Sequence, residues 1–423
     1  MTIEVTSTVE DIQRAHVSDK PSHATCANES MIVNLPTVVN SILNMSRRAR
    51  AIIDVGAIER NALNLRDRLA VATQLCAVVK ANGYGHGAIK AARAALAGGA
   101  TWLAVATADE AAALRSEAVQ EPILIMGPLD QDDLALAIEA NADMVAWTPD
   151  FVRRVSAIGT SRESRLHIKL DTGMGRWGVR EPSAAYELAA LIDEMSSVQL
   201  TGVMTHFATA DEPEETFFSR QLSRFNQIAG ALRRSHPSVM LHAANSAATL
   251  RYPDSHFDMV RCGVALYGLD PCQQNPQTWQ LEPALELHSY VAKVTCIERG
   301  ESVGYGCAFL AKAPTCIATV PIGYADGVRR TFERSVEVLV AGRRRPLAGM
   351  LSMDSLAVDL GPATDIRVGE EVVLIGTSGS ERILVEELAR RNGTINYEIV
   401  CALGDRVERS YLRREAAPKA NCD

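Results

Sequence analysis

A lysine stands at the end of an apolar run, where an unpaired charge is costly. Residues 75–79 are all apolar and lead into Lys80, which is followed by Ala81-Asn82-Gly83-Tyr84-Gly85-His86-Gly87. Lysines are rarely buried unless they are paired or reactive. The alternative is a lysine whose stem lies on apolar surface while its amine reaches solvent. The position therefore suggests a reactive amine, able to form a Schiff base with a carbonyl compound.

Two later apolar runs are followed by small residues that suit an anion. Residues 240–243 lead to Asn245-Ser246, and residues 259–262 lead to Gly263-Val264. Small residues let backbone N–H groups approach a phosphate. A glycine after a strand is more often only a turn, so this signal is weak by itself. Together with the strand-end lysine, it suggests pyridoxal 5′-phosphate (PLP), a phosphorylated cofactor held through a Schiff base.

The elements that carry these residues alternate in type. Short apolar runs alternate with helical patterns, which predicts an α/β fold with an N-terminal (β/α)8 TIM-like barrel. Non-alternating strands suit a parallel sheet buried on both faces. Active sites of such barrels lie at the C-terminal ends of the strands. The eight predicted strands are residues 75–80, 102–106, 123–126, 144–147, 167–171, 200–206, 240–243 and 259–262.

The sequence pattern changes after about residue 282. Strand-like runs at 289–297, 315–321, 336–340 and 371–375 lie between glycine-rich turns, and a helical pattern returns at 384–391. This predicts a mostly β C-terminal domain. We therefore expect an N-terminal extension (1–48) that need not be ordered, a PLP-binding barrel (49–283), the β-rich domain (284–415) and a tail (416–423). A later start at Met31 or Met45 stays open.

The amino-acid composition limits which binding partners and which cellular compartment we expect. Lys plus Arg number 43 and Asp plus Glu number 51, giving a net charge of −8, which argues against nucleic acid. No stretch reaches the roughly 18 apolar residues of a membrane helix, so no membrane partner is expected. The nine cysteines are odd in number and form no C-x-x-C pair. We expect neither a disulfide framework nor a metal site, and a cytoplasmic location. Residues 1–48 do not have the charge order of a secretory signal.

The segment around Lys80 resembles the PLP-lysine segment of alanine racemases, a family of fold-type III PLP-dependent enzymes. Further matches to this family follow in the same order along the chain. They cover both predicted domains, so the resemblance extends over about residues 50–415. These matching segments are residues 167–176, 205–207, 242–246, 260–264, 302–306, 321–327 and 352–354.

The resemblance implies a two-base interconversion of L-alanine and D-alanine. Lys80 and Tyr305 would act on opposite faces of the substrate bound to PLP, since racemisation removes a proton from one face and returns it on the other. The product would supply peptidoglycan, or the reaction would degrade D-alanine. A tyrosine needs help to act as a base, and the resemblance implies a chain from Tyr305 through His206 to Arg261.

The resemblance also implies the binding residues. Arg261 would meet the PLP pyridine nitrogen as a donor only. Arg176 would clamp the substrate carboxylate, with Met353 contributing a backbone N–H. Lys169, seven residues before Arg176, would be carbamylated, which turns a cation into an anion. The implied cofactor-binding set is Lys80, Tyr84, His206, Ser246, Arg261, Gly263 and Val264.

The resemblance implies a homodimer with shared active sites, in which Tyr305 and Met353 complete the partner's site. Tyr324, Asp211 and Arg330 resemble the lining of the access channel. Alternatives are a racemase of wider scope, acting on serine or other amino acids, and a non-catalytic PLP-binding protein, which would lack the second domain. One departure is Asp405, which stands where many members have a tyrosine near the phosphate. We assign Asp405 no phosphate role.

Overall fold

The computed structural model of the chain describes residues 48–158, 162–334 and 336–415. Of the predicted N-terminal extension, only Arg48 lies in these ranges, and the predicted tail lies outside them. Within the described residues, no helix has both the length and the apolar character needed to cross a membrane.

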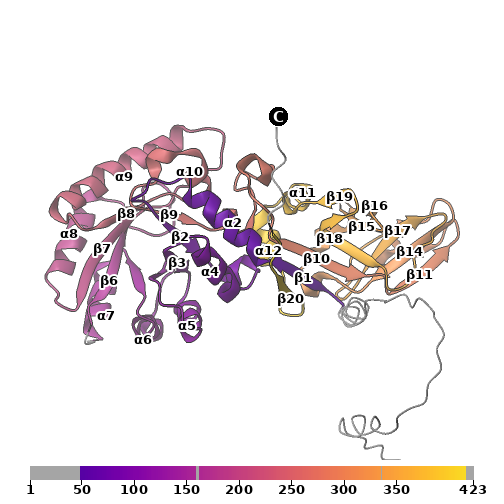
Figure 1. Ribbon diagram of the computed structural model, residues 1–423, viewed down its shortest axis with the longest axis horizontal. Helices are drawn as coiled ribbons and strands as arrows, with labels where there is room; N and C mark the ends of the chain where they lie inside the picture. Colours follow the sequence, from indigo (N-terminus) through magenta and orange to yellow (C-terminus); the bar gives the residue numbers. More distant parts are fainter. Residues whose placement is uncertain (1–47, 159–161, 335, 416–423) are drawn as a thin grey trace, which may run out of the picture. The chain divides into compact units, whose positions relative to one another are not determined.

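Eight parallel strands form a nearly closed barrel, as the alternation predicted (Figure 1). The strand order is β8-β7-β6-β5-β4-β3-β2-β9, and every neighbouring pair is parallel. Several strands are buried along their whole length, which explains why they read as continuous apolar runs. The strands are β2 (Gln74–Val78), β3 (Trp102–Val105), β4 (Ile123–Ile125), β5 (Asp143–Ala146), β6 (Ser164–Lys169), β7 (Val198–Met204), β8 (Met240–His242) and β9 (Met259–Cys262).

Helices follow the strands and pack around the barrel (Figure 1). Their starts are set by side chains that accept hydrogen bonds from free backbone N–H groups, such as Thr107, Asp130 and Thr148. The helices are α2 (Val55–Arg66), α3 (Lys80–Tyr84), α4 (Ala88–Ala97), α5 (Ala108–Ser116), α6 (Gln131–Glu139), α7 (Pro149–Ala157), α8 (Pro182–Asp193), α9 (Thr216–Ser235) and α10 (Ser246–Arg251).

The first described strand belongs to a second sheet and not to the barrel. β1 (Arg50–Asp54) pairs antiparallel with β10 (Leu285–Tyr290) and parallel with β20 (Glu408–Leu412). The sheet has the order β16-β15-β18-β10-β1-β20, with β19 paired to β18. Its remaining strands are β15 (Glu337–Val340), β16 (Arg343–Pro346), β18 (Glu371–Ser378) and β19 (Glu381–Ile383).

The rest of the second half is also mostly β, as expected. One predicted strand, residues 289–297, is wrong as a single element, because the chain passes there from β10 into a different sheet. Backbone N–H groups of Val291 and Ala292 donate to Glu370 and Thr319, which belong to separate neighbours. The other elements are β11 (Lys293–Ile297), β12 (Ser302–Val303), β13 (Phe309–Leu310), β14 (Thr315–Val320), β17 (Leu356–Gly361), α11 (Val385–Arg391) and α12 (Asn396–Cys401).

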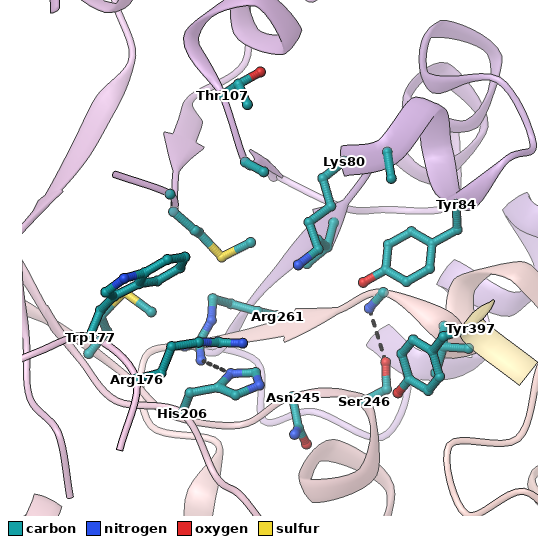
Figure 2. A pocket seen from close by; sticks show the side chains of 18 of the residues that line it. Lys80, Tyr84, Thr107, Arg176, Trp177, His206, Asn245, Ser246, Arg261 and Tyr397 are labelled. Carbon is teal, nitrogen blue, oxygen red and sulfur yellow. Dashed lines mark hydrogen bonds between the residues drawn. The ribbon is translucent and has the colours of Figure 1, made fainter. Parts of the chain in front are cut away.

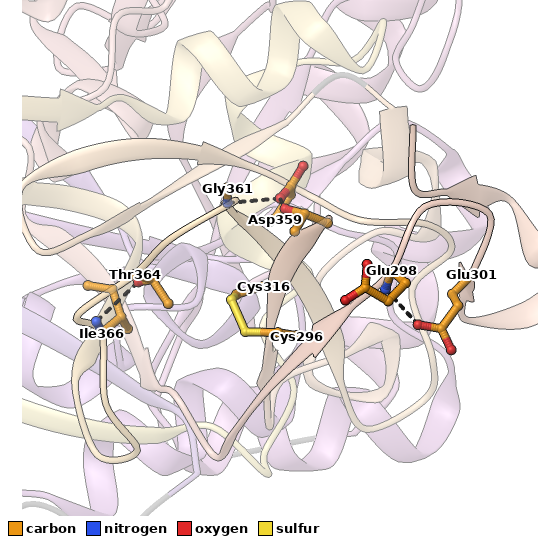
Figure 3. The surroundings of a disulfide bond; sticks show 9 residues. Cys296, Glu298, Glu301, Cys316, Asp359, Gly361, Thr364 and Ile366 are labelled. Atoms are coloured by element: carbon orange, nitrogen blue, oxygen red, sulfur yellow. Dashed lines mark hydrogen bonds between the residues drawn. A yellow bond between two sulfur atoms is a disulfide. The ribbon is translucent and has the colours of Figure 1, made fainter. Parts of the chain in front are cut away.

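One disulfide corrects the expectation from the cysteine pattern. Cys296 on β11 and Cys316 on β14 are direct partners in the antiparallel ladder, and their sulfur atoms are bonded (Figure 3). The pairing depends on the register of two strands, which the sequence spacing does not reveal. The cysteine pattern therefore no longer supports a reducing compartment.

Candidate active site

A cavity of about 540 Å³ lies at the C-terminal ends of the barrel strands. Figure 2 shows its lining, with the Lys80 amine pointing into the space. Nearly all of the side chains that the sequence selected in the barrel meet here, although they come from distant segments. The predicted residues that line the cavity are Lys80, Tyr84, Lys169, Arg176, His206, Ser246, Arg261, Gly263 and Val264.

The residues after Lys80 form a left-handed turn. Ala81, Asn82 and Tyr84 each have a φ of 52°, a conformation that costs energy for residues other than glycine. Two side chains stabilise this turn through hydrogen bonds, Glu110 from outside the turn and Asn82 from within it. Glu110 Oε1 accepts from the Ala81 N–H at 2.6 Å, and Asn82 Oδ1 accepts from the Ala88 N–H at 3.0 Å. The turn fixes where β2 ends and how the lysine enters the cavity.

The surroundings of Lys80 favour its neutral amine. Burial lowers the pKa of Lys80, and the positive charge of Arg176 lowers it further, against the opposing carboxylate of Glu110. A neutral amine can attack a carbonyl carbon or accept a proton.

One side of the cavity carries groups that could hold an anion. Ser246 Oγ accepts hydrogen bonds from the N–H groups of Gly263 at 3.0 Å and Ala265 at 3.4 Å. A Cβ at position 263 would lie 2.3 Å from the Tyr84 hydroxyl oxygen, so glycine lets that hydroxyl come close. Ser246 is the first residue of α10 and not its N-cap. Asn245 caps this helix by accepting from the Ala248 N–H.

Arg261 lies at the base of the cavity and is almost fully buried. It donates to His242 Nδ1 at 2.9 Å and to the backbone oxygens of Thr205 at 2.7 Å and Ala243 at 3.0 Å. His206 Nδ1 is 3.5 Å from the same guanidinium (Figure 2). Burial lowers the pKa of Arg261 to about 10, which still leaves it charged at neutral pH. Burial and the charge of Arg261 lower the pKa of His206 well below its usual value, so His206 is neutral.

On the side of the cavity away from Ser246, Arg176 and Lys169 both lie over the indole ring of Trp177. Arg176 Cζ lies 5.2 Å and Lys169 Nζ 5.5 Å from the ring centroid of Trp177 (Figure 2). Lys169 is 3% exposed. Burial, followed by the charge of Arg176, lowers the pKa of Lys169 to about 8. A neutral, buried amine beside an arginine is the state that can take up CO2.

Second-half residues that the sequence did not select also line the cavity. Tyr397 and Cys401 come from α12, and the Tyr397 ring lies 6.0 Å from that of Tyr84. In Figure 2 Tyr397 lies on the same side as Ser246. Burial raises the pKa of Tyr397. Asp405 is exposed and is not among the residues that line the cavity. In the sequence, Tyr397 directly precedes Glu398, but this pair alone does not mark a site.

Tyr305 and Met353 do not reach the cavity of their own chain. Their exposed fractions are 68% and 52%. Tyr305 lies in a 3-10 turn after β12 and lines a separate pocket with Tyr324, Arg330 and Leu351. The two access-channel residues predicted from this half, Tyr324 and Arg330, thus lie beside Tyr305. The resemblance implied a series of contacts from Tyr305 through His206 to Arg261. Within one polypeptide chain, the described residues show only the contact between His206 and Arg261.

Comparisons with known proteins cover both halves. Residues 53–271 match the family model "Alanine racemase, N-terminal domain", and residues 284–411 match "Alanine racemase, C-terminal domain". The alanine racemase of Geobacillus kaustophilus is 42% identical over 366 residues, 86% of this chain and 94% of that protein. Alanine racemase 1 of Bacillus subtilis is 39% identical, over 85% of this chain and 92% of that protein.

A solved structure supports the same family assignment as the sequence matches. The crystal structure of alanine racemase from Bacillus anthracis with bound L-Ala-P superposes with a TM-score of 0.82 at 37% identity. The match covers 87% of this chain and 95% of that one. The lysine, the buried arginine and the anion-binding side of the cavity all fall within the matched barrel model. This chain therefore belongs to the alanine racemase family.

Proposed function

We propose that this chain interconverts L-alanine and D-alanine with PLP and two bases, Lys80 and Tyr305. The observation that supports it most is the cavity itself, which gathers an amine of lowered pKa, a side suited to an anion and two arginines within about 540 Å³. Ligand pockets for small molecules are typically of about this size.

The residues present fit PLP by the chemistry of their donors. Lys80 supplies the primary amine for the Schiff base. The Ser246 and Tyr84 hydroxyls and the Val264 backbone N–H supply groups for a phosphate, and Gly263 keeps the cradle open, since a Cβ would fill it. Arg261 supplies a donor that cannot give up its proton, so a ring nitrogen facing it stays an acceptor. Tyr397 adds a hydroxyl on the phosphate side.

The chemistry then divides between the cofactor and the chain. When bound, PLP withdraws electrons from the substrate Cα and so acidifies its hydrogen. Lys80 Nζ takes or returns the proton on one face, for which its lowered pKa suits it. The Tyr305 hydroxyl does so on the other face. Arg176 holds the carboxylate through its planar fork, and the Met353 N–H assists.

Lys169 is proposed to be carbamylated. Its lowered pKa makes the amine reactive, and a carbamate would replace a repulsion between two cations by an attraction to Arg176. Incubation with 13C-bicarbonate should give a carbamate carbon signal in NMR. Lys169→Gln should lack it, while Lys312→Gln, which changes an exposed lysine, should keep it. A wild-type chain without this signal would remove carbamylation from the proposal.

The functional unit is proposed to be a homodimer with shared sites. Tyr305 and Met353 are exposed and lie away from the cavity of their own chain, although the reaction needs a second base there. A second copy of the chain that covers this surface would bring Tyr305 of the partner subunit to Lys80.

The first experiment follows the optical activity of L-alanine with purified protein and PLP. We expect decay to zero, abolished separately by Lys80→Ala and by Tyr305→Phe. Lys312→Ala and Tyr186→Phe are matched controls, because both residues are exposed and lie outside the cavity. Absorbance of bound PLP without decay would overturn alanine as substrate. Serine, lysine and arginine would then separate a racemase of wider scope from a non-catalytic PLP-binding protein.

The second experiment mixes the two inactive variants. In a hybrid dimer, the Tyr305→Phe chain supplies an intact Lys80 and the Lys80→Ala chain supplies an intact Tyr305. Random exchange should therefore restore about a quarter of wild-type activity. Hybrid dimers with no activity would show that each chain uses its own residues.

A further inference from the structure

A line of buried side chains leads from Arg261 away from the cavity and through the barrel interior. His242 Nδ1 is 2.9 Å from Arg261 NH1, and His242 Nε2 is 2.7 Å from His167 Nδ1. His167 Nε2 is then 3.2 Å from Asp143 Oδ2. Asp143, His167 and His242 are 0% exposed, and Arg261 is 3% exposed. Four different strands, β5, β6, β8 and β9, contribute one residue each.

The two ends of this line fix every proton in it. Arg261 can only donate, so Nδ1 of His242 must accept and its proton must be on Nε2. That Nε2–H donates to Nδ1 of His167, whose own proton is therefore on Nε2. The His167 Nε2–H donates in turn to the carboxylate of Asp143, which can only accept. The line has one direction, with both imidazoles neutral.

The surrounding groups agree with this direction. Asp143 Oδ1 accepts from Arg165 Nε at 2.7 Å and Oδ2 from the Thr201 hydroxyl at 3.4 Å, so both carboxylate oxygens act as acceptors. Burial, Arg261 and His167 together hold the pKa of His242 well below its usual value. The other groups that face the line are the Trp102 ring against His167, and Cys76, Cys262 and His206 near Arg261.

The backbone makes room for the line. A Cβ at Gly202 on β7 would lie 2.2 Å from His167 Nδ1 and 2.5 Å from its Cγ. The β6–β7 register also shifts between Leu166 and His167. The Arg261–His242 bond joins β9 to β8, the two strands at the ends of the barrel order. The position of Arg261 in the site therefore depends on a side-chain hydrogen bond between the two end strands of the barrel sheet.

We infer that Asp143 and His167 are positioning residues, which act through His242 to fix the orientation and donor pattern of Arg261 at the base of the cavity. They touch neither the cavity nor what binds in it. With a reversed His242 tautomer, an N–H would face the N–H of Arg261, and the guanidinium would have to turn. The effect on racemisation rests on the proposed function, whereas the proton pattern is a property of the chain alone.

The first test reads the proton pattern directly. Histidine-15N-labelled protein, prepared without PLP, is examined by long-range 1H–15N NMR between pH 6 and 8.5. We expect one neutral tautomer for His242, protonated at Nε2, across this range. Asp143→Ala should mix the tautomers, because the His167 Nε2–H loses its acceptor and His167 can then donate through Nδ1 to His242 instead. An unchanged His242 signal in Asp143→Ala would overturn the inference.

The second test separates positioning from general loss of structure. His167→Phe leaves the His242 Nε2–H without an acceptor, whereas in His167→Asn the amide oxygen can replace Nδ1. We expect kcat for alanine to fall about ten- to hundredfold in His167→Phe at nearly constant KM, with partial recovery in His167→Asn. His256→Gln is the matched control, since His256 is buried and its ring bonds to the backbone oxygen of Thr249, away from the line. Equal kcat in all three variants would contradict the role.

The Gly202→Ala variant provides a third, independent test of the inference. Its methyl group should displace the His167 ring and reproduce the His242 tautomer mixture without changing any member of the line. Gly230→Ala on α9 is the control, because nothing lies within 4 Å of the added Cβ. If the wild-type chain failed to racemise alanine, the NMR results would still decide the inference.

Discussion

The carboxylate of Glu110 accepts a hydrogen bond from the backbone N–H of Ala81 at 2.6 Å. Its other oxygen accepts from the Ala106 N–H at 2.7 Å, and the side chain completes the capping box at the start of α5. One carboxylate therefore joins the strained turn after Lys80 to the neighbouring strand and helix.

Glu110→Ala should loosen the Lys80 turn. Three backbone N–H groups lose their acceptor, so we expect a loss of about 1–2 kcal/mol of stability and weaker retention of PLP. Urea unfolding and absorbance of bound PLP after gel filtration measure the two effects. Glu117→Ala, at the end of the same helix and exposed, should change neither. Equal PLP retention in both variants would remove the proposed role of Glu110.

Gly263→Ala should weaken PLP binding about tenfold or more, because the new methyl group forces the Tyr84 hydroxyl out of the cradle. Fluorescence titration with PLP measures this. Gly230→Ala should leave binding unchanged and raise helix stability by about 0.5–1 kcal/mol. A tight PLP complex in Gly263→Ala would mean that Tyr84 does not contact the phosphate.

Lys169 should make the stability of the PLP-free chain depend on pH. Its folded pKa of about 8 lies below the ordinary value of 10.5, so the native state releases this proton first. Between these values the unfolded state binds more protons, and stability rises with pH. Relative to Lys169→Met, the wild type should gain at most about 3 kcal/mol across this window. Urea unfolding in CO2-free buffer measures it, and parallel pH curves would show that the lysine titrates normally.

Asp54→Ala should destabilise the chain by about 1–2 kcal/mol. Asp54 Oδ1 caps α2 by accepting from Gly56 and Ala57, and it also accepts from the Arg414 N–H at 3.1 Å. Asp54→Asn should cost less, since asparagine caps nearly as well. Asp150→Ala, an exposed change on α7, should cost at most about 0.5 kcal/mol. Urea midpoints that rank Asp150→Ala as the more harmful change would contradict this.

The barrel could be predicted because its strands are buried on both faces and read as plain apolar runs. The partner of residues 50–54 could not, since β1 pairs with segments more than 200 residues away. The Cys296–Cys316 bond was missed for a related reason. It depends on the register between β11 and β14, and register is not visible in cysteine spacing.

Lys80, Ser246 and Gly263 could be predicted because they follow strand ends, and the fold brings strand ends together. The other barrel residues of the site were implied by the resemblance to the family. Residues that reach the site through packing could not be predicted. Tyr397 enters from α12, and Glu110 acts through backbone groups, so neither belongs to a strand-end motif. Asn245 and Ser246 are both good caps, and only the structure distinguishes which one caps α10.

The pairing of β1 with β20 has a consequence for biosynthesis. The ribosome produces β1 before both of its neighbours, so β1 can pair with β10 during synthesis but with β20 only much later. The barrel strands follow one another in sequence and can assemble while the chain is still growing. The sheet that contains β1 can close only after residues 408–412 have left the exit tunnel. A nascent chain stalled before that point leaves the β1 edge that faces β20 unpaired.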